Sequence, residues 1–242
     1  IEYSRNLMTV RIAKILGLEK ILNLSKKLNI YDEIPELLSV SLGAAETTLI
    51  SLTSSYAPFV NGGNKIEPKL INRIQDRRGK TIFFFLCIKC IGCDKFINEK
   101  TELPKIENNT EKVISEETAY QMTSILEGAV KRGTGKKLRS LKVPITGKTG
   151  TTNDNYDAWF IGFSSNLVIG VYVGYDNPKT LGKFETGSKA ALPIFKDFNF
   201  FAVPLSTAPC KIEVIWYAVS SLRIFSLLFS IFGSSILSLF TN

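Results

Sequence analysis

One short stretch of this sequence combines a cation with several hydroxyl groups. The segment PITGKTGTTND, residues 144–154, holds a lysine, four threonines and two glycines between two apolar runs that resemble strands. Lys148 is therefore expected on the edge of a strand, followed by hydroxyl donors. Such a group of side chains suits the binding of an anion.

A phosphate-binding loop is the first interpretation to test, because Gly147 and Lys148 match the end of that motif. The motif requires a glycine five residues before Gly147, where Lys142 stands. Pro144 also lacks the backbone N–H that would help to hold a phosphate. The sequence therefore argues against nucleotide binding.

The complete absence of histidine limits the possible chemistry further. None of the 242 residues is a histidine, which excludes a Ser-His-Asp triad, a Cys-His pair and most catalytic zinc sites. A nucleophile would have to be activated by a lysine or a carboxylate. One known scheme of this kind brings Ser-x-x-Lys, Ser-x-Asn and Lys-Thr-Gly together in a single cleft.

Two of these three elements occur in the chain. Ser4-Arg5-Asn6 supplies Ser-x-Asn, and residues 148–150 supply Lys-Thr-Gly. Taken alone, Ser-x-Asn is a weak signal, since Ser4 could simply cap the following helix. No serine in the chain is followed by a lysine three positions later, so the sequence contains no Ser-x-x-Lys.

Composition and charge are compatible with a folded domain that meets anionic partners. The 45% apolar content is ample for a core, and the formal charge of +8 would attract nucleic acid, a lipid surface or a carboxylate substrate. The densest basic run, KRGTGKKLRSLK at 131–142, has no acid and no aromatic residue for base stacking. We expect it to be a solvated linker, and we expect no nucleic-acid partner.

Three cysteines at a spacing of three residues raise the question of a metal. Cys87, Cys90 and Cys93 lack a fourth ligand, because Ile97 and Asn98 stand where a ferredoxin sequence would place cysteine and proline. A disulfide or buried thiols in a strand is the simpler interpretation. We expect no metal and no cofactor.

The periodicity of apolar residues predicts helices in the first half of the chain. Residues 4–30 should form two short helices interrupted at Gly17, and 46–60 should form a third helix. Residues 77–80 should be a hairpin turn. Ser115 is a good N-cap for a helix that extends to 133, with acids in its first turn and bases in its last.

The later half of the chain predicts a buried hairpin with a helix over it. The runs DAWFIGF (157–163) and NLVIGVYVGYD (166–176) are almost wholly apolar, so both faces of these strands must be covered. The segment 188–198 is a candidate covering helix. Three glycines leave room for the close approach of a helix or a neighbouring backbone: Gly162, Gly170 and Gly174.

Several segments together resemble one family. YSRNLMTVRIA, LSVSLGAAETTLISLTSSYAPFVNGG, AYQMTSILEGAVKRGTG and GKTGTTNDNYDAWFIGFSSNLVIGVYVGYDN occur in the order of that family. The chain resembles the transpeptidase domain of class A, bifunctional penicillin-binding proteins of the 1A type. The resemblance covers residues 1–198 and is weak over 83–109.

The resemblance implies an α/β (α+β) fold of the β-lactamase and transpeptidase kind, with an antiparallel central sheet flanked by helices. The sheet is expected to be incomplete here, since the family takes further strands from before its nucleophile. Residues 1–198 would be the C-terminal portion of the transpeptidase domain. Residues 199–242 would be an apolar tail of uncertain origin.

The resemblance also implies a function, in which a serine attacks a D-Ala-D-Ala stem peptide and passes the acyl group to an amine. Penicillins acylate the same serine. The Ser-x-x-Lys nucleophile is expected before Ile1, together with a glycosyltransferase module and a membrane anchor. This chain alone is expected to be inactive.

By the same resemblance, each matching motif residue has an expected role. Ser4 would relay a proton, Asn6 would hold the stem-peptide amide, and Lys148 would hold Ser4 and add positive potential. The substrate would lie along the strand edge as an added strand. Its carboxylate and its oxyanion would meet the residues that follow the lysine: Thr149, Gly150 and Thr151.

The expected partners are peptidoglycan stem peptides, β-lactam antibiotics and, through an anchor outside this chain, a membrane. The expected location is the periplasmic face of the bacterial inner membrane. Two alternatives stay open. The chain could be a non-catalytic remnant or binding module of the same fold, or a relative of DD-carboxypeptidases and β-lactamases.

The last 44 residues differ sharply in composition from the rest of the chain. Beyond Phe198 the only charged residues are Lys211, Glu213 and Arg223, and none occurs in 224–240. A membrane span, a hydrophobic surface segment and a non-native sequence are all compatible with this composition.

Overall fold

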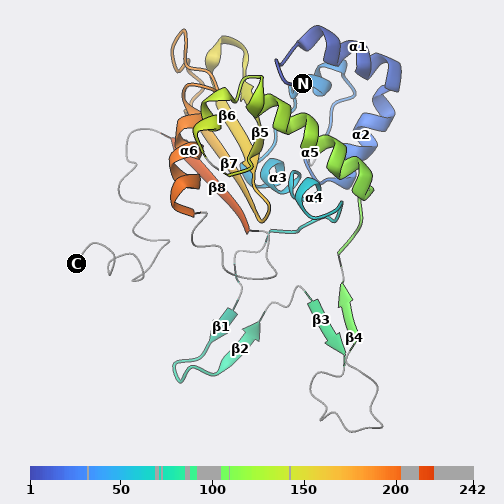
Figure 1. The fold of residues 1–242 in the computed structure, drawn as a ribbon, viewed down its shortest axis with the longest axis vertical. Coiled ribbons are helices and arrows are strands. Elements are labelled where there is room, and N and C mark those ends of the chain that lie inside the picture. The colour runs from blue at the N-terminus through green and yellow to red at the C-terminus, as the bar shows by residue number, and fades with distance from the viewer. Residues whose placement is uncertain are drawn as a thin grey trace, which may run out of the picture.

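A four-stranded sheet forms the centre of the computed structural model (Figure 1). Its order is β5-β6-β7-β8, with bounds Thr146–Thr151, Ala158–Phe163, Leu167–Gly174 and Glu213–Ser220. The structure describes residues 1–31, 33–68, 71, 73–84, 88–91, 105–108, 110–141, 143–202 and 213–220, with backbone alone at 84, 88–91, 105–108, 199–202 and 213–220.

Three strands of this sheet are antiparallel, as the sequence predicts. Strand β5 pairs with β6, and β6 pairs with β7, so that Lys148 lies opposite Ile161. Strand β8 departs from the expectation, because it pairs with β7 in parallel. The reason is topological: β8 follows α6 (Ala191–Ala202), and a crossover connection of this kind returns the chain in the original direction.

Two hydrophobic layers enclose the sheet, as the apolar character of the hairpin requires. Helix α6 covers one face, where the rings of Phe160 and Phe195 lie 4.7 Å apart between centroids. Ile161 and Phe163 point to the other face and pack with Leu126. The covering helix expected at 188–198 is confirmed.

The predicted role of the strand glycines is confirmed for two of the three. A Cβ on Gly162 would meet the ring of Phe195, and a Cβ on Gly170 would meet the side chain of Thr53. Gly174 instead faces the hydroxyl group of Tyr172 in its own strand. Glycine at the first two positions therefore lets helices approach both faces closely.

The N-terminal helices agree with the sequence prediction. Helices α1 (Asn6–Leu16) and α2 (Leu18–Lys27) meet at Gly17, which has a φ of 87°. This left-handed backbone favours glycine and ends the first helix. A short 3₁₀-helix, η1 (Leu38–Leu42), follows.

The single helix predicted over 46–60 is wrong, since two shorter helices occupy this range. They are α3 (Leu49–Ser54) and α4 (Ala57–Val60). Pro58 lacks an N–H and would clash with the carbonyl four residues earlier, so the first helix ends before it and Pro58 lies in the first turn of the next. The hydroxyl of Ser55 also donates to the carbonyl of Leu52, which competes with helix continuation.

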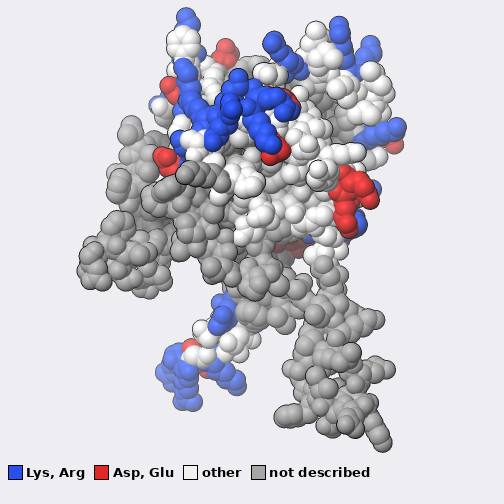
Figure 2. All heavy atoms as spheres, in the orientation of Figure 1, with Lys and Arg blue, Asp and Glu red and all other residues white. Residues whose placement is uncertain are grey.

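The longest helix, α5 (Glu116–Lys131), begins where the sequence predicts. The Ser115 hydroxyl oxygen accepts a hydrogen bond from Thr118 N at 3.2 Å, and acids occupy the first turn. The basic run after α5 is solvated as predicted, but it also forms a 3₁₀-helix, η2 (Lys136–Ser140), whose Leu138 is buried. Figure 2 shows Lys and Arg side chains gathered over this end of α5, with acids at its beginning.

Two small hairpins extend away from the main body (Figure 1). Their strands are β1 (Arg73–Gln75) with β2 (Thr81–Phe84), and β3 (Ile88–Ile91) with β4 (Lys105–Asn108). The predicted turn at 77–80 is confirmed, with Asp76 accepting hydrogen bonds from the backbone of Arg78 and Lys80.

The cysteine prediction falls almost wholly outside the described residues. Cys87 and Cys93 are not described, and of Cys90 only the backbone, within β3, is described. Residues 224–240, the stretch without charge, likewise lie outside the described residues. Among the helices that the structure describes, none has the length and apolar character needed to cross a bilayer.

Candidate active site

The edge strand β5 brings the two sequence motifs together. Lys148 Nζ donates a hydrogen bond to Ser4 Oγ at 2.5 Å, although the two residues lie 144 positions apart in the chain. The same amine donates to the backbone carbonyl of Thr149 at 2.8 Å. In the described part of the chain, β5 has a partner strand on one side only. The lysine therefore lies at an open border of the sheet.

The environment of Lys148 leaves its charge available to an anion. The amine is half-buried, and burial lowers the pKa of Lys148 below its ordinary value of 10.5. Its two hydrogen-bond acceptors are neutral, and no carboxylate in the described ranges forms an ion pair with it. A bound carboxylate would supply the missing countercharge.

The loop before α1 holds Ser4 in a turn rather than at a helix cap. Ser4 has a φ of 51°, and its backbone N–H donates to the carbonyl of Ile1 at 3.1 Å. The N-cap of α1 is Arg5, and no side chain caps this end. The simple capping role considered for Ser4 is therefore wrong. Asn6, the first residue of the helix, is exposed, and its side chain makes no hydrogen bond to the residues that the structure describes.

The two threonines of the motif are each fixed by a different neighbour. Thr149 Oγ1 lies 2.7 Å from Thr134 Oγ1, and Thr151 Oγ1 accepts a hydrogen bond from Gly187 N at 3.0 Å. Because the Gly187 bond uses the oxygen of Thr151, the hydroxyl hydrogen is left to donate to a ligand. Thr151 is exposed and Thr149 is half-buried.

The residues around Gly150 leave little space on the inner face of the strand. A Cβ on Gly150 would lie 3.0 Å from Trp159 Cβ, which is tighter than ordinary packing. Gly187 lies against the carbonyl oxygens of Gly150 and Trp159, and a Cβ on Gly187 would overlap both. The segment that carries Gly187 thus fits closely over β5.

Sequence reasoning missed the partners that support the motif residues. Gly187 and Thr134 were not predicted, and neither was the ion pair between Glu2 and Arg132. The only available signal was the glycine-rich break RGTG between the helix and the strand, which was assigned to the basic run. A tertiary contact of this kind has no periodic pattern in the sequence.

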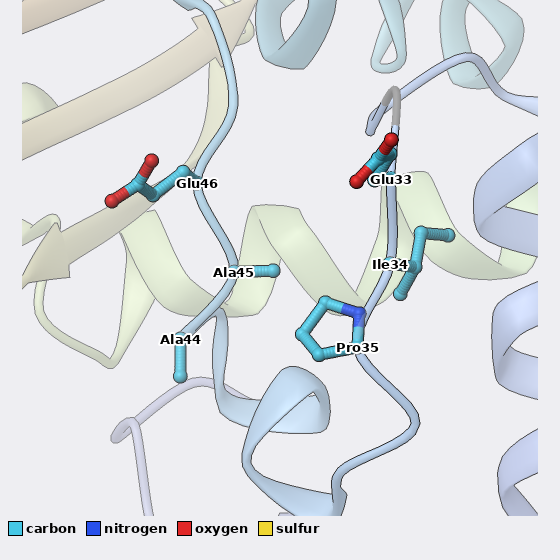
Figure 3. Close-up of a pocket in the computed structure, with 6 residues that line it drawn as sticks. All are labelled: Glu33, Ile34, Pro35, Ala44, Ala45 and Glu46. Carbon is cyan, nitrogen blue, oxygen red and sulfur yellow. The ribbon is translucent and has the colours of Figure 1, made fainter.

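A pocket elsewhere in the molecule is a weaker candidate. It has a volume of about 450 Å³ and lies beside the loops that flank η1 (Figure 3). Its lining contains none of the predicted site residues: Glu33, Ile34, Pro35, Ala44, Ala45 and Glu46. Among the described residues, no group of three or more Cys, Asp or Glu side chains is arranged to hold a metal ion.

Comparison with known families defines the class of this chain. A profile described as the penicillin binding protein transpeptidase domain matches residues 1–199. The chain belongs to this family of transpeptidase domains.

Individual relatives narrow the class. A protein of Rickettsia prowazekii named Penicillin-binding protein 1A is 46% identical over 201 residues, which cover 81% of this chain and 25% of that protein. A Pseudomonas aeruginosa protein of the same name is 32% identical over 231 residues, covering 83% of this chain and 28% of that protein. The class A, 1A type indicated by the sequence is confirmed. The chain spans about a quarter of the length of these relatives.

Solved structures agree with the assignment of the fold. The crystal structure of Penicillin-Binding Protein 1A from Haemophilus influenzae matches with a TM-score of 0.70 and 31% identity, covering 88% of this chain and 34% of that one. The D,D-transpeptidase domain of a peptidoglycan glycosyltransferase from Eggerthella lenta matches with a TM-score of 0.60 at 16% identity, covering 85% and 52%. The predicted transpeptidase-like fold is confirmed.

Proposed function

We propose that this chain is the C-terminal part of the transpeptidase domain of a peptidoglycan synthase. The observation that carries the proposal is the hydrogen bond between Lys148 Nζ and Ser4 Oγ at the open border of β5. It joins Ser-x-Asn to Lys-Thr-Gly, two of the three elements of a lysine-activated serine acyltransferase. The relatives named Penicillin-binding protein 1A support the same conclusion.

The reaction would be an acyl transfer in two steps. A serine oxygen attacks the carbonyl carbon of the penultimate D-Ala, the peptide C–N bond breaks, and the terminal D-Ala leaves with the proton that the serine lost. An amine on a neighbouring strand of peptidoglycan then attacks the ester and returns a proton to the serine. β-Lactams would acylate the same serine, because their strained amide occupies the place of the peptide bond.

The residues of this chain would bind and orient the peptide. The substrate would lie along β5 as an added strand, which aligns it through main-chain hydrogen bonds. Lys148 and the hydroxyls of Thr149 and Thr151 would bind its terminal carboxylate, and Asn6 would hold an internal amide. Gly150 would keep the Lys-Thr-Gly strand close to Trp159, and Thr151 N–H would be one oxyanion donor.

Ser4 would connect these binding groups to the proton transfer. It would pass a proton between the lysine of a Ser-x-x-Lys segment and the leaving amine, with Lys148 holding its hydroxyl in place. Because 242 residues contain no Ser-x-x-Lys, the nucleophile would belong to a longer protein, and this chain alone would be inactive. That longer protein would be anchored in the bacterial inner membrane and would act on its periplasmic face.

The binding half of this proposal can be tested on the chain itself. Calorimetric titration would compare a diacetyl-L-Lys-D-Ala-D-Ala peptide with the same peptide carrying a C-terminal amide. We expect only the free carboxylate to bind. Lys148→Met should weaken that binding by about tenfold or more, because it removes a charged hydrogen-bond donor.

Lys136→Met is the matched control, since Lys136 is an exposed lysine of η2 outside the site. It should bind the peptide within about twofold of the unchanged chain, because Lys136 contributes only to the long-range field. Equal affinity for the acid and the amide, or equal effects of the two lysine variants, would contradict the proposal.

The catalytic half requires a longer protein that carries this chain behind a Ser-x-x-Lys segment. A fluorescent penicillin should label that protein covalently and should leave the 242-residue chain unlabelled. Peptide binding without labelling of the longer protein would instead identify a non-catalytic binding module. Labelling of the chain alone would contradict the assignment of the nucleophile to another segment.

A further inference from the structure

We infer that Glu2 and Arg132 form a positioning pair that sets the Ser4 loop against β5. The pair, called here the Glu2–Arg132 clamp, contacts neither the expected substrate nor the reacting atoms. It would act through Ser4 and Lys148 by fixing their separation. The catalytic meaning of the clamp rests on the proposed function, whereas its effect on the geometry of Lys148 can be measured independently.

The clamp joins the first residues of the chain to the end of α5 by three hydrogen bonds. Arg132 Nε donates to Glu2 Oε2 at 3.1 Å, and Arg132 Nη2 donates to the other oxygen, Oε1. The carbonyl of Glu2 accepts a bond from Thr134 N at 3.2 Å. A bidentate guanidinium–carboxylate pair with an additional backbone hydrogen bond fixes the orientation of Glu2 as well as its distance from Arg132.

Two glycines make room for Glu2 and provide a second line of support. A Cβ on Gly128 would overlap the carboxylate of Glu2, and a Cβ on Gly133 would overlap its carbonyl oxygen. Both glycines lie at the C-terminal end of α5, where a side chain at either position would fill the space that Glu2 occupies. The last turn of the helix is therefore shaped to receive this one residue.

Electrostatic effects agree with the geometry. The hydrogen bonds from Arg132 hold the pKa of the Glu2 carboxyl below its ordinary value, and Glu2 raises the pKa of Arg132. Arg132 is well exposed, so such a pair adds little to global stability. Its contribution is therefore expected in local geometry rather than in the free energy of unfolding.

The clamp reaches the site from two directions. Glu2 lies two residues before Ser4, whose hydroxyl accepts the hydrogen bond of Lys148. Thr134, which binds the Glu2 carbonyl, also places its hydroxyl 2.7 Å from that of Thr149. One short segment after α5 thus holds both the Ser-x-Asn loop and the Lys-Thr-Gly strand.

This arrangement explains why the clamp would matter for Ser4 in particular. Among the described residues, the backbone N–H of Ser4 bonds only to the nearby carbonyl of Ile1, at 3.1 Å, and the φ of Ser4 is positive, which is uncommon for serine. A loop held only by Lys148 would move away from β5 easily. Displacement by about 1 Å can reduce a rate by about 100-fold, so fixing this loop would be worthwhile for catalysis.

The test uses the full 242-residue chain and does not require substrate. A small acylating reagent labels lysine amines, and mass spectrometry follows the modification of Lys148 over time. In the unchanged chain, the hydrogen bond that the amine donates to Ser4 should keep labelling slow, because it stabilises the protonated amine, which does not react. Glu2→Gln and Arg132→Met should each increase the Lys148 rate several-fold, and Arg132→Lys should lie between them and the unchanged chain.

Lys131→Met is the matched control, because Lys131 is the last residue of α5, directly before Arg132, and forms a 2.7 Å ion pair with Glu127. It removes one positive charge, as Arg132→Met does, and should leave Lys148 labelling unchanged. Thermal unfolding of every variant shows whether the fold persists. Unchanged labelling in both clamp variants, or the same increase in Lys131→Met, would overturn the inference.

A second arm connects the clamp to catalysis in the longer, penicillin-labelled protein. There the clamp variants should reduce the rate constant of acylation by about 10- to 100-fold, with little change in the initial non-covalent binding constant. A loss confined to initial binding would overturn the positioning role. Failure of the longer protein to acylate at all would defeat the proposed function while leaving the labelling result intact.

Discussion

Lys148 owes its properties to an environment that is half-buried and contains only neutral partners. Burial makes the charged form less favourable, while the open side of β5 leaves the amine accessible to an anion. The positive charge of the lysine is therefore available to pair with an anionic ligand. The same feature makes ligand binding sensitive to alkaline pH.

We expect the affinity for a carboxylate-ended peptide to fall as pH rises through the lowered pKa of Lys148. The sign follows from the ligand's need for the cation: below that pKa the amine is charged and binding is full, and above it binding is lost. The loss should begin at a lower pH than the ordinary lysine value of 10.5. Titration calorimetry at increasing pH would measure it. Affinity that stays constant up to pH 10.5 would contradict this expectation.

Gly187 offers a second test at the scale of one residue. Gly187→Ala should displace the segment from β5, because the new Cβ would overlap the carbonyls of Gly150 and Trp159. The hydrogen bond to Thr151 Oγ1 would be lost with it. We expect a fall in peptide affinity of about tenfold, measured by the same titration.

Ser188→Ala is the control for Gly187→Ala. Its hydroxyl lies 3.0 Å from that of Thr186, within the same segment, and makes no hydrogen bond to the described residues of β5. Peptide affinity should therefore be retained. If Gly187→Ala binds as well as Ser188→Ala, the segment does not orient Thr151.

The sequence could predict the motif residues but not the residues that hold them. Lys148 and Ser4 were recognised because their residue types match known motifs, even though they are far apart in the chain. Thr134, Glu2 and Gly187 were not recognised, since their roles depend on contacts that only the folded chain creates. No local pattern marks a glycine that must lie against a particular carbonyl.

At the scale of elements, the sheet depends on a close contact between α3 and β7. Gly170 of β7 faces Thr53 of α3, whose hydroxyl donates to the carbonyl of Leu49. Both residues lie in the interior, and Thr53 is fully buried. Small side chains here set the distance between the helix and the sheet.

Gly170→Ala should destabilise the chain by about 1–3 kcal/mol, because an additional methyl group would overlap Thr53. Thr53→Ala in the same chain should recover part of this loss by removing the hydroxyl. Urea unfolding of the two single variants and the double variant would give the coupling energy. Purely additive losses would show that the two positions do not share this space.

The elements that were predicted correctly had strong local signals. Gly17 between α1 and α2 and Ser115 before α5 are backbone and capping features that the sequence displays directly. The break between α3 and α4 is hidden in the sequence because the apolar periodicity continues across Pro58. The parallel direction of β8 depends on tertiary pairing, which no feature of its own sequence specifies.

At the scale of the whole molecule, β8 connects the C-terminal segment to the sheet. Ending the chain at residue 202 would remove β8 and leave the outer backbone groups of β7 unpaired. We expect a lower unfolding temperature and self-association through the uncovered strand. Thermal unfolding and light scattering would measure both effects.

A chain ended at residue 220 is the matched control, because it retains β8. It should melt at a higher temperature and scatter less light than the chain ended at residue 202. Equal behaviour of the two shortened chains would show that β8 adds nothing to the sheet. The division of the chain at residue 198, and the origin of residues 199–242, stay predictions.

Charged side chains are distributed unevenly along α5, which makes one end of the helix negative and the other positive. Acids occupy the first turn of this helix, whereas bases crowd its last turn and η2, beside the segment that holds Thr149 (Figure 2). The positive field at this end of the molecule would orient the protein toward an approaching anionic peptide before the two make contact. Raising ionic strength should therefore slow the capture of an anionic peptide, seen by stopped-flow mixing, while leaving its escape rate nearly unchanged.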